Sequence, residues 1–204
     1  MGRRSKSTER RGQILKAAAS LFVKHGYLNT SVRDIANACN VNVATLYHYI
    51  GSKEKILGLF QEYTTDRMKS IIERERETID GMNPIDALVY TLRIYLKWVE
   101  EYQDVTVFWY QESKNLTREQ MKNLTAQEEY TVEIFTGLLT KGVEQGLFSL
   151  ENARLAAHNI VVLCDMWAFR RWLLKKEFTF DQYVQDQIDL ILSQLSVERN
   201  LRPH

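Results

Sequence analysis

Residues 30–50 read TSVRDIANACNVNVATLYHYI, and this stretch decides the fold of the 204-residue chain. Ser31 and Asp34 have the spacing of a capping box, which predicts a short helix after Ser31. Asn40 tolerates a positive φ in a tight turn, and Asn42 suits the cap of a second short helix that reaches Tyr49. Two short helices joined in this way are typical of the helix-turn-helix motif, whose second helix enters the major groove of DNA.

The second of these helices carries most of the side chains that we expect at DNA. The residues of its first turn are short, so the backbone can approach base edges, where a methyl group contacts thymine and a hydroxyl can hydrogen-bond. Tyr47 and His48 offer an O–H and an N–H to phosphate oxygens. Lys53 adds a full charge near the N-terminus of the next helix, where an anion is favoured. The candidate DNA contacts are Thr30, Arg33, Asn42, Val43, Ala44, Thr45, Tyr47, His48 and Lys53.

The charge of the chain is divided between this region and the remainder. The net charge is +1, but residues 1–60 hold ten basic and three acidic side chains, whereas the other 144 residues hold 17 basic and 23 acidic ones. Such a split indicates that one part meets a polyanion, and by itself it fits a membrane-binding head as well as a nucleic-acid-binding one. The residue spacing over 30–54 favours nucleic acid. Residues 1–8 are expected to be a mobile basic arm, and the basic side chains assigned to it are Arg3, Arg4, Lys6, Arg10 and Arg11.

Apolar periodicity and capping residues predict an all-α chain of about nine helices. Only two prolines and nine glycines interrupt the sequence, which favours long helices over many short strands. The expected helices lie over 9–25, 32–39, 42–49, 53–78, 104–112, 117–145, 149–176 and 179–197, and a fifth helix in chain order opens at Asn83-Pro84 and includes Val99. Besides the arm at 1–8, a tail is expected at 200–204. We therefore predict a three-helix DNA-binding domain over 1–51 and a larger domain over 52–204, joined by the helix at 52–78.

The segments Thr30–Ala36, Val41–Tyr49 and Ser52–Glu54 together resemble the DNA-binding domain of the tetracycline-repressor (TetR-type) family. The resemblance covers residues 9–57 and is specific, because many positions agree at fixed spacing. Cys39-Asn40 stands where the family usually has Ala-Gly, and Asn42, Ala44 and Ile50 replace Ser, Gly and Phe. Each replacement keeps the local physics, but Asn42 and Ala44 lie at the groove, so the resemblance does not carry over the base sequence that is read. The resemblance implies nine helices: three for DNA, a linking fourth, and a C-terminal body for ligand binding and dimerisation.

Large aromatic and polar side chains in the C-terminal body are the candidates for ligand contact. The candidate set is Tyr95, Trp98, Phe108, Trp109, Gln111, Glu112, His158 and Trp167. Ordinary core packing accounts for most of the aromatic members, since a helical body of this size needs large apolar side chains. The segments at 108–114 and 166–172 resemble branches of the family that sense fatty-acid or steroid degradation intermediates. Two basic groups could meet a coenzyme A thioester or serve only solubility: Arg170, Arg171, Lys175 and Lys176, or Arg93 and Lys97.

The last two helices, at about 150–176 and 179–197, are expected to form a homodimer, because the family resemblance implies a four-helix bundle there. One supporting stripe consists of small and apolar residues: Ala153, Ala156, Ala157, Ile160, Val161, Cys164 and Ala168. The other consists of Val184, Ile188, Ile191, Leu192 and Leu195. A stripe of this kind can also pack only within its own subunit.

Other classes of protein find little support. His158, Cys164 and Asp165 are the nearest approach to a catalytic set, but His158 and Cys164 point about 120° apart on one helix, so we expect no enzyme. We also expect no metal, no cofactor, no membrane span and a cytoplasmic location. The sequence thus predicts a dimeric transcription factor, a repressor that a small and largely apolar effector releases from a palindromic operator. An architectural DNA-binding protein without a ligand, or an enzyme with a helix-turn-helix head, is the alternative.

Overall fold

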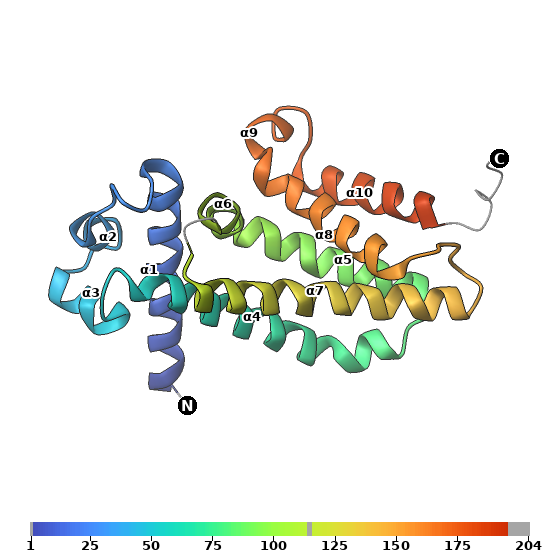
Figure 1. The fold of residues 1–204 in the computed structure, drawn as a ribbon, viewed down its shortest axis with the longest axis horizontal. Helices are drawn as coiled ribbons and strands as arrows, with labels where there is room; N and C mark the ends of the chain where they lie inside the picture. Colours follow the sequence, from blue (N-terminus) through green and yellow to red (C-terminus); the bar gives the residue numbers. More distant parts are fainter. Residues whose placement is uncertain (1, 114–115, 196–204) are drawn as a thin grey trace. The chain divides into compact units, whose positions relative to one another are not determined.

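Ten α-helices and no strand make up the residues that the computed structural model describes, 2–113 and 116–195 (Figure 1). The helices are α1 (Gly2–His25), α2 (Val32–Ala38), α3 (Val43–Ile50), α4 (Lys55–Asp80), α5 (Pro84–Glu101), α6 (Gln103–Glu112), α7 (Arg118–Glu144), α8 (Ala153–Phe169), α9 (Arg171–Leu174) and α10 (Phe180–Leu195). The predicted fold class, an all-α chain with an N-terminal helix-turn-helix and a larger helical body, is confirmed. The count is ten rather than nine, because the predicted eighth helix is divided in two.

The chain separates into two compact units. The first unit comprises residues 1–69 and 102–125, and the second comprises residues 70–101 and 126–204. Helices α4 and α7 each contribute residues to both units. The predicted boundary at residues 51/52 separates the DNA-binding part from the ligand-binding part by function, whereas the two units are defined by compactness. That functional boundary stays a prediction.

The first unit is built around α1, which packs against α2, α3 and α6. Ile14, Leu15 and Phe22 lie on the predicted inner face of α1 and are at most 2 % exposed. The ring of Phe22 meets the ring of Phe108 on α6 at a centroid distance of 5.4 Å. Helix α1, against which the two helices of the helix-turn-helix pack, is therefore also packed against a helix that lies far away in the sequence.

Helix α1 begins earlier than predicted. It starts at Gly2, so the expectation of a mobile arm over 1–8 is wrong for residues 2–8. Residues 2–8 hold no apolar side chain to set a helical period, but Arg3, Arg4 and Lys6 have high helix propensity and no proline interrupts them. The tail predicted at 200–204, and the predicted end of the last helix at Val197, lie outside the described residues.

The predicted eighth helix differs from α8 at both ends. Asn152 is the N-cap rather than Ser149, and its side chain accepts from the N–H of Leu155 at 2.9 Å. The N–H of Ser149 instead donates to the carbonyl of Leu195 at 3.0 Å. The helix ends at Arg170, whose φ of −114° and ψ of 17° lie outside the helical region, and α9 follows. No glycine or proline marks this break in the sequence. The fourth helix also starts later than predicted, at Lys55.

The second unit is organised around α5, α8 and α10, which contact one another (Figure 1). Leu88, Leu92 and Leu96 on α5 are fully buried. Ala157 and Cys164 on α8 are also fully buried, and these small side chains let α5 and α8 approach closely. Burial of this apolar surface is the main stabilising contribution to the body.

Gly142→Ala is expected to destabilise the protein by about 1–3 kcal/mol, because a β-carbon at Gly142 would overlap the ring of Phe148. Phe148 is 5 % exposed, and its N–H donates to the carbonyl of Gly142 at 3.1 Å, so the ring has little room to withdraw. Gly137→Ala on the same helix is the control. Apart from its chain neighbours and the nearby backbone of its own helix, no described atom lies within 4 Å of its added carbon, so replacing a helical glycine there should stabilise by about 0.5–1 kcal/mol. Urea unfolding followed by circular dichroism measures both, and changes of the same sign would contradict the prediction.

Candidate nucleic-acid interface

The local geometry of the helix-turn-helix agrees with its sequence signals. The side chain of Ser31 accepts from the N–H of Asp34 at 3.2 Å, and Asp34 Oδ2 accepts from the N–H of Ser31 at 2.8 Å, which completes a capping box. These bonds lower the pKa of the Asp34 carboxyl, so the box holds at neutral pH. Asn40 has a φ of 51°, and Asn42 Oδ1 accepts from the N–H of Thr45 at 2.6 Å. Each short helix therefore begins at a satisfied cap.

The two helices bury one face and expose the other. Ile35 and Ala36 on α2, with Leu46 and Ile50 on α3, are at most 2 % exposed and fix the angle between the helices. The opposite face of α3 is open to solvent. Its exposed or half-buried side chains are Asn42, Val43, Ala44, Thr45, Tyr47 and His48. A helix with its small residues outward in the first turn, held rigidly from behind, is what major-groove reading requires.

Lys53 lies between the end of α3 and the start of α4. Its ammonium group sits 4.5 Å from the centroid of the Tyr27 ring and donates to the carbonyl of Leu28 at 3.4 Å. Burial, with a smaller effect from Glu54, raises the pKa of the Tyr27 hydroxyl, so that ring stays neutral beneath the cation. The charge of Lys53 is thereby held close to the loop at 27–30 on the same head.

Thr30 is a correction to the predicted DNA contacts. It is 2 % exposed, and its hydroxyl donates to the carbonyls of Gly26 at 2.9 Å and Leu21 at 3.3 Å. Thr30 therefore closes the turn between α1 and α2 and offers no free hydroxyl. Arg33, by contrast, is exposed on the outer face of α2, as a phosphate contact requires.

Two of the basic residues assigned to the arm have partners inside the first unit. Arg10 donates to the carbonyl of Cys39, the C-cap of α2, at 2.9 Å. Arg11 pairs with Glu62 on α4 at 3.5 Å. These contacts hold α1 against α2 and α4. Both residues therefore help to fix the packing of the helices within the first unit, and they also add positive charge.

The second unit contains a buried polar contact between α5 and α8. The hydroxyl of Tyr95 donates to Asp165 Oδ1 at 3.1 Å, and Asp165 is 2 % exposed. The Tyr95 ring stacks on Trp98 at 5.9 Å and meets the edge of Phe135 at 5.8 Å. Burial, reinforced by Asp165 and Glu128, raises the pKa of Tyr95 well above its ordinary value. The hydroxyl is therefore a permanent donor inside the body.

A second polar contact lies where α8 gives way to α9. Trp167 Nε1 donates to Glu100 Oε2, and Arg171 Nη2 donates to Glu100 Oε1 at 2.9 Å. One carboxylate at the end of α5 thus holds residues on either side of the break at Arg170. This contact places Trp167 and Arg171 relative to α5.

The predicted ligand residues are divided between the two units. Phe108, Trp109, Gln111 and Glu112 belong to the first unit, whereas Tyr95, Trp98, His158 and Trp167 belong to the second. Phe108 contacts Phe22 and Phe60 as part of the first core, so it packs there as an ordinary core residue. His158 is exposed on α8, and the prediction that it faces a ligand is not supported by its position. A groove of about 230 Å³ between α4 and α7 is lined by none of the predicted residues.

The stripe predicted for the dimer interface lies mostly inside the subunit. Ala157, Ile160, Val161, Cys164 and Ala168 are at most 7 % exposed, and so are Val184, Ile188, Ile191 and Leu195. A different apolar set is exposed on these helices, namely Leu155 at 57 %, Val162 at 47 % and Leu190 at 48 %. Leu155 and Val162 are seven residues apart, so they share one face of α8, with His158 between them. This spacing was a sequence signal for an outward stripe.

Comparison with known proteins gives a match for the helix-turn-helix head and another for the C-terminal body. The family model described as bacterial regulatory proteins of the tetR family matches residues 14–59. A second, described as the tetracyclin repressor-like C-terminal domain, matches residues 81–175. The chain belongs to the TetR family of bacterial regulatory proteins. As a TetR-family chain it is a helix-turn-helix DNA-binding transcriptional regulator.

Three similar proteins show how far the likeness extends. The transcriptional regulator HbdR of Aromatoleum sp. (strain CIB) is 28 % identical over 185 residues, which cover 90 % of this chain and 80 % of HbdR. The TetR-family regulator PfmR from Thermus thermophilus is 29 % identical, with a TM-score of 0.72 over 91 % of this chain and 99 % of PfmR. AibR, solved with isovaleryl coenzyme A and operator DNA, is 24 % identical, with a TM-score of 0.70 over 89 % of this chain and 97 % of AibR.

Two further observations concern membranes and metals. Within residues 2–113 and 116–195, none of the helices combines the length and the apolar character needed to span a bilayer. The same residues hold no group of three or more His, Cys, Asp or Glu side chains placed to bind a metal ion.

Proposed function

We propose that this TetR-family regulator is a homodimeric repressor that leaves a palindromic operator when a small, largely apolar effector binds its body. The observation that carries the proposal is the outward face of α3. Ala44, Tyr47 and His48 are exposed there beside a cap that Asn42 satisfies, and the inner face is buried. Two such heads related by a two-fold axis would read successive major grooves.

The exposed apolar residues of α8 and α10 support the homodimer. Leu155, Val162 and Leu190 are about half exposed, although neighbouring positions on the same helices are buried. Exposed apolar residues on one face mark protein–protein contact, and a two-fold interface uses the same face of both subunits. We assign the interface to these outward residues instead of the buried stripe.

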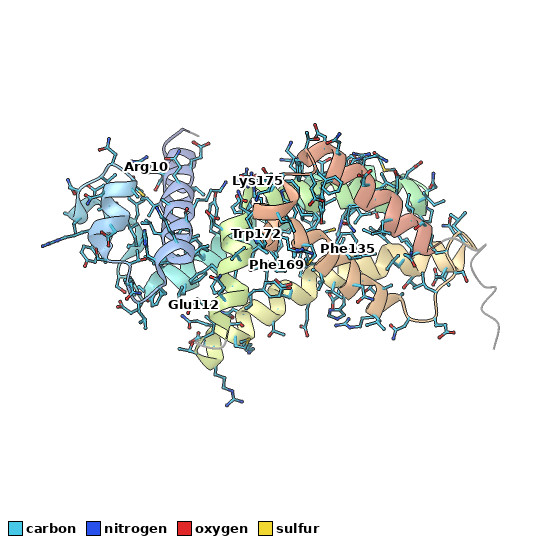
Figure 2. All side chains as sticks on the ribbon, turned by 90° about the horizontal axis from the view of Figure 1, so that it is seen from above. Arg10, Glu112, Phe135, Phe169, Trp172 and Lys175 are labelled. Carbon is cyan, nitrogen blue, oxygen red and sulfur yellow. The ribbon has the colours of Figure 1, made fainter. Side chains whose placement is uncertain are left out.

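The effector class that we propose is an acyl-coenzyme A or a related degradation intermediate. Exposed cations lie on α5 at Arg93 and Lys97, and Arg170, Lys175 and Lys176 flank α9. Trp172 on α9 is 65 % exposed beside Lys175, and an aromatic ring next to cations suits a nucleotide with phosphates (Figure 2). AibR, a protein of the same fold, was solved with isovaleryl coenzyme A, and it supplies a first compound to test.

A selection experiment tests the proposed function. A duplex enriched by the purified protein from a random pool should contain an inverted repeat, and the protein should bind it as a dimer. Adding isovaleryl coenzyme A and longer acyl-coenzyme A compounds should release that duplex, because an effector acts by binding the DNA-free state more tightly. Enrichment of direct or single half-sites would contradict the dimer. Binding that no member of the series alters would contradict the acyl-coenzyme A class.

Lys53→Ala is expected to weaken binding to every duplex and to reduce the salt dependence of the binding constant. Removing one phosphate contact lowers the slope of log K against log salt concentration by about 0.9 per site. Lys53 also contacts the loop at 27–30, so a loss of affinity alone would fit a purely structural role. A reduced salt dependence would indicate that Lys53 contacts a phosphate. Lys122→Ala, an exposed lysine on α7, is the control. Fluorescence anisotropy at several salt concentrations gives both quantities, and an unchanged slope removes Lys53 from the DNA contacts.

A further inference from the structure

Helix α3 carries a narrow set of side chains for a helix that reads DNA. Its sequence from Val43 to Ile50 is VATLYHYI, which contains no arginine, lysine, asparagine, glutamine, aspartate or glutamate. In the major groove a bidentate arginine or lysine recognises guanine, a bidentate asparagine or glutamine recognises adenine, and an acidic side chain accepts from cytosine. Hydroxyls contact several bases alike, so the selective contact left to α3 is the apolar one with the 5-methyl group of thymine.

Asn42, the N-cap of α3, carries an amide beside this surface, but the cap fixes how that amide is turned. Its Oδ1 accepts from the N–H of Thr45 at 2.6 Å, so the oxygen points at the backbone of the first turn. Bidentate recognition of adenine needs the oxygen and the amino group of the amide to face the base together. Asn42 therefore cannot read adenine in this way while it caps α3.

The first turn of α3 presents methyl groups on its outward face. Ala44 is exposed there, and Val43 is half-buried. On the opposite face Leu46 and Ile50 are at most 2 % exposed, and the cap at Asn42 fixes the start of the helix. The methyl groups of Val43 and Ala44 are therefore held at fixed positions on the face that meets DNA.

The polar rings of α3 come later along the helix. Tyr47 and His48 are exposed, but they belong to its second turn, whereas the N-terminal residues of the second helix contact base edges in a helix-turn-helix. The O–H of Tyr47 and the N–H of His48 suit phosphate oxygens, which carry no sequence information. Discrimination between bases by α3 thus depends on Val43 and Ala44.

We propose that Val43 and Ala44 recognise the 5-methyl groups of thymine, so that the operator positions facing the first turn of α3 are A·T pairs selected through their thymines. The inference deepens the proposed DNA-binding function and rests on it. Burial of one methyl group contributes about fourfold in affinity. Two heads on a palindromic operator make each contact twice, so removing one thymine methyl from each half-site should weaken binding about sixteenfold.

Replacement of thymine by deoxyuridine tests the proposal, because deoxyuridine lacks only the 5-methyl group and keeps the base pairing. The duplex selected from the random pool is remade with deoxyuridine at one thymine position at a time, in both half-sites. Its binding to the full chain is measured by fluorescence anisotropy at one salt concentration. We expect about sixteenfold weaker binding at one or two thymine positions and no change at the others. A selected duplex in which no thymine methyl affects binding overturns the proposal.

Two variants assign the thymine contacts to residues. Ala44→Gly and Val43→Ala each remove methyl groups from the protein, so the ratio of affinities for the thymine and deoxyuridine duplexes should fall at least fourfold at the position that each residue contacts. A substitution that only weakens the helix lowers both affinities equally and leaves this ratio unchanged. Ala38→Gly, at an exposed alanine of α2, is the control and should also leave the ratio unchanged.

The outcomes separate this inference from the function on which it rests. A ratio that one variant leaves unchanged removes that residue from the thymine contacts, and an unchanged ratio in both variants overturns the proposal while the wild-type protein still binds its selected duplex. Failure of the wild-type protein to select any duplex refutes the proposed function, and this inference with it.

Discussion

A Val162→Glu variant is expected to be a monomer and to bind the selected operator at least a hundredfold more weakly than the wild type. Val162 is 47 % exposed on the outward face of α8, in line with Leu155. In a two-fold interface the substitution places two unpaired carboxylates against the apolar face of the other subunit. An unpaired buried charge costs about 3–5 kcal/mol, and linking two binding modules raises overall affinity by about 10²–10⁴ over either alone.

The control for this variant is Val143→Glu. Val143 is 38 % exposed on α7, so the chemical change is the same and the starting exposure is similar. Analytical ultracentrifugation gives the mass in solution, and anisotropy with one-half-site and two-half-site duplexes separates dimer loss from damage to the head. The variant should keep its affinity for a single half-site. If Val162→Glu remains dimeric, the outward face of α8 is not the interface.

The head could be predicted from sequence in detail because its structure is decided locally. The capping box at Ser31 and Asp34, the positive φ of Asn40 and the cap at Asn42 each depend on residues within three positions of one another. Such signals survive without knowledge of tertiary contacts. Thr30 shows the limit of this reasoning. Its hydroxyl donates to the carbonyls of Leu21 and Gly26. Leu21 is nine residues away, so its carbonyl comes within reach of the hydroxyl only when the turn between α1 and α2 has formed.

The body was less predictable because its features depend on contacts between distant segments. The break at Arg170 has no glycine or proline, and Glu100, which holds Trp167 and Arg171 about it, is 67 to 71 residues away. The stripe of Ala157, Val161 and Cys164 has the small residues of an intersubunit seam, but α5 of the same chain covers it. Periodicity identifies an apolar face, whereas the neighbour that covers it follows only from the fold.

The buried polar side chains of the second unit show the same limit. Tyr95 was predicted for its aromatic ring, but its hydrogen bond to Asp165 joins positions 70 residues apart. Thr91 and Gln187 carry no motif, since an unpaired hydroxyl or amide is visible only when every neighbour is known. His158 was predicted to contact a ligand, but its side chain is exposed on the outward face of α8. The type of side chain was enough to select Tyr95 from the sequence. The hydrogen bonds of the folded chain are needed to identify Asp165, Thr91 and Gln187.

An Ala44→Glu variant is expected to lose about a hundredfold in operator affinity while its head becomes no less stable. Ala44 is exposed in the first turn of α3, where the added carboxylate would face the phosphates and base edges of the groove. Repulsion of several kcal/mol between like charges at an interface corresponds to such a loss, since about 1.4 kcal/mol is tenfold. The same carboxylate lies at a helix N-terminus, where a negative charge stabilises the helix by about 0.3–1 kcal/mol.

The opposite signs of these two effects make the Ala44→Glu experiment decisive. A variant that lost DNA binding through misfolding would show a lower melting temperature, whereas a carboxylate that faces DNA lowers affinity and keeps or raises the melting temperature. Thr140→Glu on α7 is the control, because it adds a similar carboxylate at an exposed position of the body. Calorimetry and anisotropy on all three proteins give both quantities. Wild-type affinity in the Ala44 variant would show that another face of the head meets the operator, because a carboxylate in the groove has no compensating partner there.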